Sequence, residues 1–378
     1  MKNALCFLAA VFAFAHLHAQ TLVERLTPFV EAHVLAGAVT AVATSNAVLQ
    51  TDAVGFADIA NKRPMKTDAL FWIASQSKAM TAAALMMLVD EGKVKLDDPV
   101  TKYIPQFKNP WVVQEATNNR MTLAHAATPV TVRKLLSHTS GLPFSSEVEA
   151  PHLDSLPLRD AVYTYALTYL KTEPGTKYSY SNAGINTCGR IIEVVSGMSY
   201  EAFMQARLFD PLGMKDTTFW PTPEQEARLA KSYKPDSAGS GLEETQISQL
   251  TYPLHDRASR YPMPAGGLFS TAADVICFCQ MLLNNGTFEG KRVLSADAVR
   301  EMTSKQTGAL QDNYGFGLSL TPTGFGHGGA YATNMSVDRS KGLVTVYLVQ
   351  HAGFPKNGKQ AFDVFMNFAR ERITQTDK

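Results

Sequence analysis

The hydrophobic pattern places strand-like segments near both ends of the chain and helical segments between them. Residues 22–34 carry apolar positions at helical spacing, and residues 38–57 hold two β-rich runs around a turn, which predicts a helix followed by a β-hairpin. Residues 343–349 are almost uniformly apolar and rich in β-branched side chains, as in a strand buried on both faces. A closing helix with one apolar stripe over residues 361–369 follows.

The long middle of the chain shows helical periodicity from about residue 93 to residue 260, with Pro and Gly turns between the segments. The order of strands, helices, then strands and a helix predicts a mixed α/β (α+β) domain. We expect one sheet built from both chain ends, with a mostly helical lobe over approximately residues 76–260 inserted between them. The further helices expected are 132–138, 158–170, 183–195, 200–209 and 272–283, and the further strands are 314–320 and 331–337.

Residues 1–19 have the layout of a secretory signal peptide. Lys2 precedes a wholly apolar run over residues 4–15, and the small Ala19 stands before Gln20. The run is too short to cross a bilayer core of roughly 30 Å, which argues against the alternative of a membrane anchor. We therefore expect cleavage after Ala19, a single mature domain over residues 20–378 without a membrane span, and a secreted or periplasmic location.

Composition and charge narrow the function classes. The 378 residues are 45% hydrophobic and 18% charged, which is a globular balance. A net charge of +1 argues against broad binding to nucleic acid or to an anionic membrane. Without the leader an odd number of cysteines remains, so we expect buried free thiols rather than a disulfide framework. These cysteines are Cys188, Cys277 and Cys279.

One apolar helix carries a serine and a lysine at its start. Residues 79–89 contain no charged side chain, which predicts a helix buried on all sides and ended by Gly92. Lys78 then enters the core at the first turn, which costs free energy unless the amine has partners or loses its charge. Ser75 lies three residues earlier, so its side chain lies over the same face as Lys78.

Ser75 and Lys78 form a candidate nucleophile and base. A serine hydroxyl needs a neighbour that takes its proton, and a lysine whose pKa is lowered by burial can accept it. The Ser75 amide belongs to the helix start, where free N–H groups favour a developing oxyanion. The alternative is an accidental Ser-x-x-Lys spacing in a chain rich in both residues. The apolar helix that follows favours the catalytic interpretation.

A second candidate motif lies just before the predicted helix over residues 183–195. Tyr180 and Asn182 are two positions apart there, so both side chains can project into one cleft from an extended loop. A phenol near an amine can act as a base or pass a proton to a leaving group, and an amide can hold a lysine and a substrate carbonyl. The alternative is a simple loop in which Ser181 or Asn182 caps the helix.

A third candidate motif is the glycine-rich segment over residues 324–331. Glycines in a strand allow another backbone, such as that of a substrate, to approach closely. The alternative is a glycine-rich hairpin bend in which the histidine takes no part. The candidate site residues in this segment are His327, Gly328, Gly329 and Ala330.

These three motifs, in this order, make the chain similar to the serine β-lactamase and penicillin-binding-protein superfamily. Within it the chain resembles the class C β-lactamase-like branch of D,D-carboxypeptidases and esterases. Residues 135–143 and 265–274 add to the resemblance, which covers nearly all of the mature chain. The resemblance implies a β-lactamase-like fold with an antiparallel sheet. It also implies that Ser75 is the nucleophile, that Lys78 activates it, and that Tyr180 is the general base and leaving-group acid.

The same resemblance assigns the groups that bind substrate. Asn182 matches the amide that supports the lysine and the substrate, and the amides of Ser75 and Ala330 match the two donors of an oxyanion hole. The third motif of the family is usually Lys-Thr-Gly. Here it is His327 followed by Gly328 and Gly329, which departs from the family pattern.

This departure weakens the place where the family binds a substrate carboxylate. His327 has an ordinary pKa near 6.5 and is mostly neutral at pH 7, and Gly328 has no hydroxyl to donate. One hydrogen bond from His327 remains available by this reasoning. Efficient turnover of β-lactams or D-alanyl peptides is therefore less expected, and uncharged esters or other amides become more plausible substrates.

We expect an exported serine hydrolase that cleaves a small-molecule ester, amide or β-lactam bond through an acyl-enzyme on Ser75. The alternatives are a D,D-peptidase, an acyltransferase, or a non-catalytic sensor of the penicillin-binding type, and the sequence predicts no particular oligomeric state. It contains no Gly-x-Ser-x-Gly elbow, no zinc motif and no phosphate-binding glycine loop, so neither a metal nor a cofactor is expected.

Overall fold

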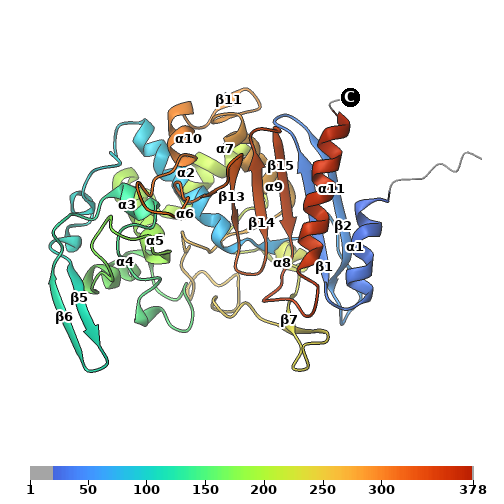
Figure 1. Ribbon diagram of the computed structural model, residues 1–378, viewed down its shortest axis with the longest axis horizontal. Helices are drawn as coiled ribbons and strands as arrows, with labels where there is room; N and C mark the ends of the chain where they lie inside the picture. The colour runs from blue at the N-terminus through green and yellow to red at the C-terminus, as the bar shows by residue number, and fades with distance from the viewer. Residues whose placement is uncertain (1–19, 377–378) are drawn as a thin grey trace, which may run out of the picture.

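The computed structural model describes residues 20–376, and the predicted signal peptide lies outside this part of the chain (Figure 1). A seven-stranded antiparallel sheet runs in the order β12-β13-β14-β15-β1-β2-β3. Strands from the two chain ends meet where β1 (Gly37–Ala43) pairs with β15 (Leu343–Leu348). The prediction of one antiparallel sheet built from both ends is confirmed. The other strands are β2 (Val48–Asp58), β3 (Arg63–Pro64), β12 (Ser319–Leu320), β13 (Gly324–Gly328) and β14 (Asn334–Asp338).

Helices cover both faces of this sheet. The first helix, α1 (Leu22–Glu31), and the last, α11 (Gln360–Thr376), lie side by side against one face, where Leu26 and Phe365 share a core (Figure 1). On the other face α9 (Ala272–Leu283) packs on β1 and β15. Since apolar side chains cover both faces, every residue of β1 and of β15 is buried, as the sequence pattern predicts for β15.

The helical lobe is built around α2 (Ser77–Asp90), in which every residue from Ser77 to Leu88 is buried. This confirms the prediction of a core helix. Two short hairpins that the sequence analysis missed also belong to this part of the chain, because their polar, exposed strands lack a clear apolar period. The hairpins are β5 (Trp111–Thr117) with β6 (Arg120–His125) and β7 (Ser232–Pro235) with β8 (Leu242–Thr245).

The helices of the lobe agree with the predicted windows except at their ends. The window 158–170 ends early because Leu170 leaves the helix and pairs with the backbone of Trp111 and Val113 in β5. The window 200–209 continues as a π-helical turn over Gln205–Phe209 into α7. The helices are α3 (Val132–Leu136), α4 (Leu158–Leu167), α5 (Asn182–Ser196), α6 (Tyr200–Met204), α7 (Asp210–Leu212), α8 (Pro223–Arg228) and α10 (Ala296–Met302).

Two predicted strands are shorter than expected, and close packing around the site explains both. Of the window 314–320 only Ser319 and Leu320 pair in the sheet. Gly317 has a φ of +66°, and a Cβ there would lie 2.5 Å from the Lys78 carbonyl oxygen, so the chain turns sharply as it passes α2. In the window 331–337 a turn holds Ala332 at a φ of +66°, so that β14 begins only at Asn334.

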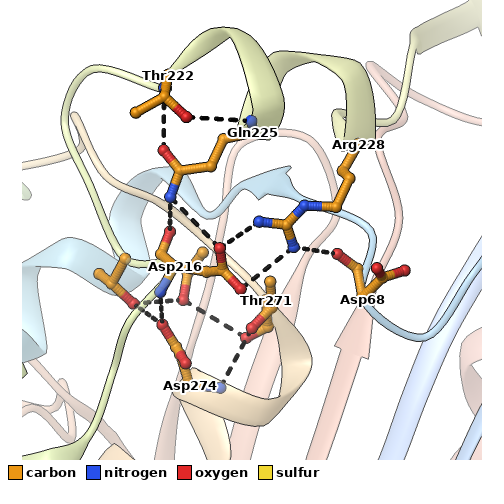
Figure 2. Close-up of polar contacts among 9 residues, drawn as sticks. Asp68, Asp216, Thr222, Gln225, Arg228, Thr271 and Asp274 are labelled. Atoms are coloured by element: carbon orange, nitrogen blue, oxygen red, sulfur yellow. Dashed lines mark hydrogen bonds and ion pairs between the residues drawn. The ribbon is translucent and has the colours of Figure 1, made fainter.

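Polar contacts fasten the segment before α8 to the start of α9 (Figure 2). Thr271 caps α9 by accepting from the Asp274 amide at 3.3 Å. The Asp274 carboxylate does not complete a capping box; it accepts instead from the Asp216 amide at 2.8 Å and from a threonine hydroxyl. Arg228 bridges Asp216 and the Asp68 carbonyl in the same view. These contacts attach the segment before α8 to the helix α9 that packs on the sheet.

Four short strands complete the elements, and they form two-stranded ladders. The ladders pair β4 (Phe71–Trp72) with β9 (Phe269–Ser270) and β10 (Thr287–Phe288) with β11 (Lys291–Arg292).

Within residues 20–376 no helix is long and apolar enough to span a bilayer.

Candidate active site

A buried, strained turn presents Ser75 to solvent. Ser75 is the only residue between Ala69 and Leu88 that is not buried. The preceding residue, Ala74, has a φ of +47°, a left-handed conformation that is unfavourable for a residue with a Cβ. The Ser77 hydroxyl donates to the Ala74 carbonyl at 2.6 Å and holds this turn at the start of α2. The local fold therefore exposes one hydroxyl from an otherwise closed core.

Lys78 is fully buried directly beneath this hydroxyl. Its Nζ lies 3.1 Å from Ser75 Oγ, donates to the Ala265 carbonyl at 2.7 Å, and lies 4.6 Å from the centre of the Tyr180 ring. No carboxylate of the described chain forms an ion pair with it. Burial lowers the pKa of Lys78 well below its usual value, which favours the neutral amine. A neutral amine at hydrogen-bonding distance from a serine hydroxyl can accept its proton.

Tyr180 lies beside Ser75 and Lys78, as the sequence predicts. Burial raises the pKa of Tyr180 above its usual value, and the Ser75 hydroxyl opposes this shift. The phenol is therefore neutral at ordinary pH, and it is suited to donate a proton rather than to act as a preformed phenolate.

Asn182 is the first residue of α5, where the sequence analysis expected an extended loop. Its neighbour Ser181 caps the helix by accepting from the Gly184 amide at 3.0 Å, so the capping alternative holds for Ser181. The Asn182 side chain is nearly buried, and its Oδ1 has no hydrogen-bond partner within the described chain. In the described part of the chain no hydrogen bond joins this side chain to the Lys78 amine. An unpartnered buried amide oxygen is suited to accept a hydrogen bond from a bound molecule.

The third motif is a strand, β13, whose end packs against the Ser75 turn. A Cβ on Gly329 would lie 2.6 Å from the Ile73 carbonyl oxygen, so only glycine permits this approach. Gly328 and Ala330 on either side are exposed. The amides of Ser75 and Ala330 have no acceptor among residues 20–376. The structure thus leaves both candidate oxyanion donors free, on two segments that Gly329 brings together.

His327 belongs to a buried chain of hydrogen bonds. The Ser181 amide donates to Nδ1 of His138 at 3.2 Å, so His138 carries its proton on Nε2 and donates to the Tyr314 hydroxyl at 3.3 Å. Tyr314 in turn donates to Nε2 of His327 at 3.1 Å. The remaining proton, on Nδ1 of His327, goes to the Gly328 carbonyl at 2.6 Å. Each donor has one acceptor, and the direction of the chain is fixed.

This arrangement changes what His327 can do. Both of its ring nitrogens are occupied, so the single hydrogen bond that the sequence analysis left to it is not available for a substrate. Burial, with a smaller contribution from the nearby Lys78, lowers the pKa of His327 to about 4, so the ring is neutral at pH 7. Burial likewise lowers the pKa of His138 well below its usual value. The site therefore offers no imidazolium to an anionic substrate.

The sequence analysis missed several residues that the structure joins to the site. His138 lies within residues 135–143, which the family resemblance already included, but nothing local indicated its partner Tyr314. Ala265 likewise lies within residues 265–274, and its contact with Lys78 spans more than 180 positions. No group of three or more metal-ligating side chains occurs in the described part of the chain.

Comparison with known proteins identifies the family. The model of the Beta-lactamase family matches residues 22–364. The chain belongs to the Beta-lactamase family. Protein Rv1367c of Mycobacterium tuberculosis is 33% identical over 355 residues, which cover 85% of this chain and 87% of that protein. Esterase EstB of Burkholderia gladioli is 30% identical, with 84% of this chain and 86% of the esterase covered.

Solved structures agree on the fold. EstCE1, described as a hydrolase with promiscuous acyltransferase activity, superposes with a TM-score of 0.74 over 92% of this chain and 97% of its own, at 23% identity. The Beta-lactamase family contains serine hydrolases that act on small ester, amide or β-lactam substrates, among them the esterase EstB. The predicted membership of the superfamily and the predicted fold class are confirmed.

Proposed function

We propose that this protein is an exported serine hydrolase that cleaves uncharged esters through an acyl-enzyme on Ser75. The observation that carries the proposal is the fully buried Lys78 amine, 3.1 Å from a hydroxyl that the surrounding turn exposes. The similarity of this chain to Esterase EstB supports an ester substrate.

In the first step the Ser75 oxygen attacks the ester carbonyl carbon while its proton passes to the neutral Lys78 amine. The carbonyl oxygen becomes an oxyanion that accepts from the free amides of Ser75 and Ala330. The bond to the leaving alcohol then breaks. The alcohol takes a proton from Tyr180, which receives one from the Lys78 ammonium, so the amine and the phenol return to their starting states.

In the second step water attacks the acyl carbon, and its proton passes through Tyr180 to Lys78. The bond to Ser75 breaks, the serine oxygen takes that proton back, and a carboxylic acid leaves. An acceptor alcohol in place of water gives acyl transfer by the same proton path, which is the second candidate function. The promiscuous acyltransferase activity of EstCE1 favours keeping this candidate.

Charge in the site favours an uncharged substrate. Where family members place a Lys-Thr pair, this chain has a neutral His327 with both nitrogens occupied and a Gly328 without a side chain. A carboxylate would therefore meet neither an ammonium group nor a hydroxyl at this place, which disfavours β-lactams and D-alanyl peptides. A Cβ on Gly328 would meet nothing closer than 3.6 Å, so the space for a side chain is present.

One panel of substrates tests the proposed activity. The mature protein and its Ser75→Ala variant are assayed with a short-chain nitrophenyl ester, a chromogenic cephalosporin and a D-alanyl-D-alanine peptide. We expect ester turnover that the variant loses, and labelling of Ser75 by a fluorophosphonate in the parent alone. Equal turnover by the variant would show that Ser75 is not the nucleophile.

The anion-site argument has its own test. The double variant His327→Lys/Gly328→Thr restores a cation and a hydroxyl, and it should raise cephalosporin turnover relative to ester turnover by about tenfold, the effect of one charge-assisted hydrogen bond. An unchanged ratio would refute the argument. Export belongs to the same proposal: the mature N-terminus is expected at Gln20, in a secreted or periplasmic fraction, and N-terminal sequencing checks it.

A further inference from the structure

We propose that Asn186 is a positioning residue for the Lys78 amine, acting through the backbone of Ala265. The inference rests on the proposed function, because it concerns how the base of that reaction is held. Asn186 lies one helical turn after Asn182 on α5 and is buried. Neither its sequence position nor the family resemblance singles it out.

Every polar atom of the Asn186 amide has a partner, and this fixes its orientation. Oδ1 accepts from the Ala265 amide at 3.0 Å, and because a backbone N–H can only donate, the oxygen must face that peptide. Nδ2 donates to the hydroxyls of Tyr165 at 2.9 Å and Tyr261 at 3.1 Å. The amide therefore cannot rotate without breaking several buried hydrogen bonds.

The residue that Asn186 holds is the one that accepts from Lys78. The Ala265 N–H donates to Asn186, and the Ala265 carbonyl oxygen, on the next peptide bond, accepts from Lys78 Nζ at 2.7 Å. The Pro264 carbonyl, on the same peptide bond as the Ala265 N–H, accepts from the Thr81 hydroxyl at 2.8 Å. Two side chains on different helices thus hold both edges of the Pro264–Ala265 peptide bond, directly before the Ala265 carbonyl.

The position of the Ala265 carbonyl determines where the lone pair of the Lys78 amine points. A neutral amine has two N–H groups and one lone pair. When one N–H is committed to the Ala265 carbonyl, rotation about the last bond of Lys78 is restricted, and the lone pair is free for the Ser75 proton at 3.1 Å. A carbonyl displaced by about 1 Å would turn the lone pair away, and a misplacement of this size can cost about 100-fold in rate.

A buried carboxyl group anchors the far end of this chain. Tyr165 and Tyr261 both donate to Glu149, which is almost fully buried, and the Ser146 amide donates to its other oxygen at 2.7 Å. Burial raises the pKa of Glu149. The contacts run in order from Glu149 through a tyrosine and Asn186 to the Ala265 N–H, and from the Ala265 carbonyl to Lys78.

The groups that face Lys78 determine how its titration responds. Tyr180, His138 and His327 surround the amine from the other elements packed against it, and all three are neutral at pH 7 by the pKa shifts described above. The Ala265 carbonyl favours the protonated amine, since it accepts a charge-assisted hydrogen bond from it. Loss of the hydrogen bond to this carbonyl should lower the pKa of Lys78 further, whereas looser packing that admits water to the amine should raise it.

The test replaces Asn186 by Leu, which keeps its approximate volume, and replaces Thr187 by Val as the matched control. Thr187 is also buried on α5 and donates to the Ala183 carbonyl at 2.7 Å, without contact to this chain. A third variant, Tyr165→Phe, removes only the hydroxyl between Glu149 and Asn186. Nitrophenyl ester kinetics are measured against pH, with the rate of fluorophosphonate labelling as an independent readout.

We expect Asn186→Leu to lower kcat about 10- to 100-fold with KM within about threefold, and to move the acidic limb of kcat/KM to lower pH. Tyr165→Phe should move both readouts in the same direction by less, and Thr187→Val should move neither. An acidic limb that moves to higher pH, or kinetics equal to those of Thr187→Val, would overturn the inference. A parent protein without ester turnover or labelling would instead overturn the proposed function.

If Asn186→Leu does not fold, Tyr165→Phe carries the test alone. Its aromatic ring and packing are kept, so a lower kcat with an acidic limb at lower pH supports the positioning role. Parental values for both would contradict it.

Discussion

Among the residues whose burial the structure describes, two cationic side chains are buried, and they are held in opposite ways. Arg260 pairs with the equally buried Asp154 at 2.6 Å and also donates to the carbonyls of Phe219 and Leu254. Lys78 has a carbonyl, a hydroxyl and an aromatic face around it, and no carboxylate among the described residues. One charge is compensated by a partner; the other is avoided by loss of a proton.

The difference follows from the two side chains as well as from their surroundings. A guanidinium cannot lose its proton at any ordinary pH, so burying it requires a partner and hydrogen bonds to its N–H groups. An ammonium group can lose its proton, and burial without a partner makes it do so. The arginine therefore serves as a clamp, whereas the lysine becomes a base. Arg260 has a carboxylate partner and a structural role, whereas Lys78 has no such partner in the described chain and can serve as the proposed base.

The Arg260 clamp stabilises the loops that border the proposed site. Besides the arginine, Asp154 accepts from the Thr251 amide at 2.8 Å, and its own carbonyl accepts from the Tyr261 amide. The Tyr261 hydroxyl reaches Asn186, so the clamp and the chain to Lys78 share one segment of the chain.

The largest effect expected is the loss of activity when Lys78 becomes apolar. Lys78→Met should lower ester turnover by about 1,000-fold or more, because Tyr180, which also contacts Ser75, is a neutral phenol and a poor base. The same variant should unfold with a free energy about 1–2 kcal/mol higher, since burying the amine costs stability. Nitrophenyl ester kinetics and urea unfolding measure the two effects. A Lys78→Met variant that is stable and fully active would show that Lys78 is not the base.

The second effect concerns the clamp. Asp154→Asn leaves Arg260 buried without its counter-charge, and it should lower the free energy of unfolding by about 3–5 kcal/mol. The double variant Asp154→Leu/Arg260→Met removes both charges and should recover most of this loss. Urea unfolding at constant pH checks both. A double variant less stable than Asp154→Asn would show that the pair does more than satisfy its own charges.

The smallest effect is a pH dependence from the neutral rings around Lys78. The pKa of His327 is about 4 in the folded protein and near 6.5 in the unfolded chain, so below pH 6.5 the unfolded chain binds a proton that the folded protein does not. Stability should therefore fall as the pH falls from 6.5 to about 4. Replacing His327 by Gln should reduce this slope by ~1.4 kcal/mol per pH unit.

Urea unfolding between pH 4 and 6.5 measures the slope for the parent and for His327→Gln. Equal slopes for His327→Gln and the parent would mean that the ring is already protonated when folded, and the neutral environment of Lys78 would need another explanation.

The sequence predicted the features that depend on residues close together along the chain. The charge-free run after Lys78 indicated a core helix, and the spacing to Ser75 indicated the contact between the lysine amine and the serine hydroxyl. The uniform run over residues 343–349 indicated the buried strand. Each of these depends on neighbours within a few positions, so periodicity and helix geometry were sufficient.

Contacts between distant segments could not be predicted in the same way. His138 and Tyr314 lie more than 170 positions apart, and Asn186 meets Ala265 across nearly 80. Neither pair has a spacing that reveals it. The occupied nitrogens of His327 follow from those distant partners, so the sequence alone left it a hydrogen bond that the fold does not.

The pairing of β1 with β15 has a consequence for how activity arises during synthesis. Val39 faces Leu348 across the middle of the sheet, more than 300 positions along the chain. A growing polypeptide thus emerges with its serine, lysine and tyrosine long before the strand that brings up His327 and Ala330. Ala330 can therefore meet Ser75 only after the final fifty or so residues are translated, and the proposed site stays incomplete in any shorter nascent chain.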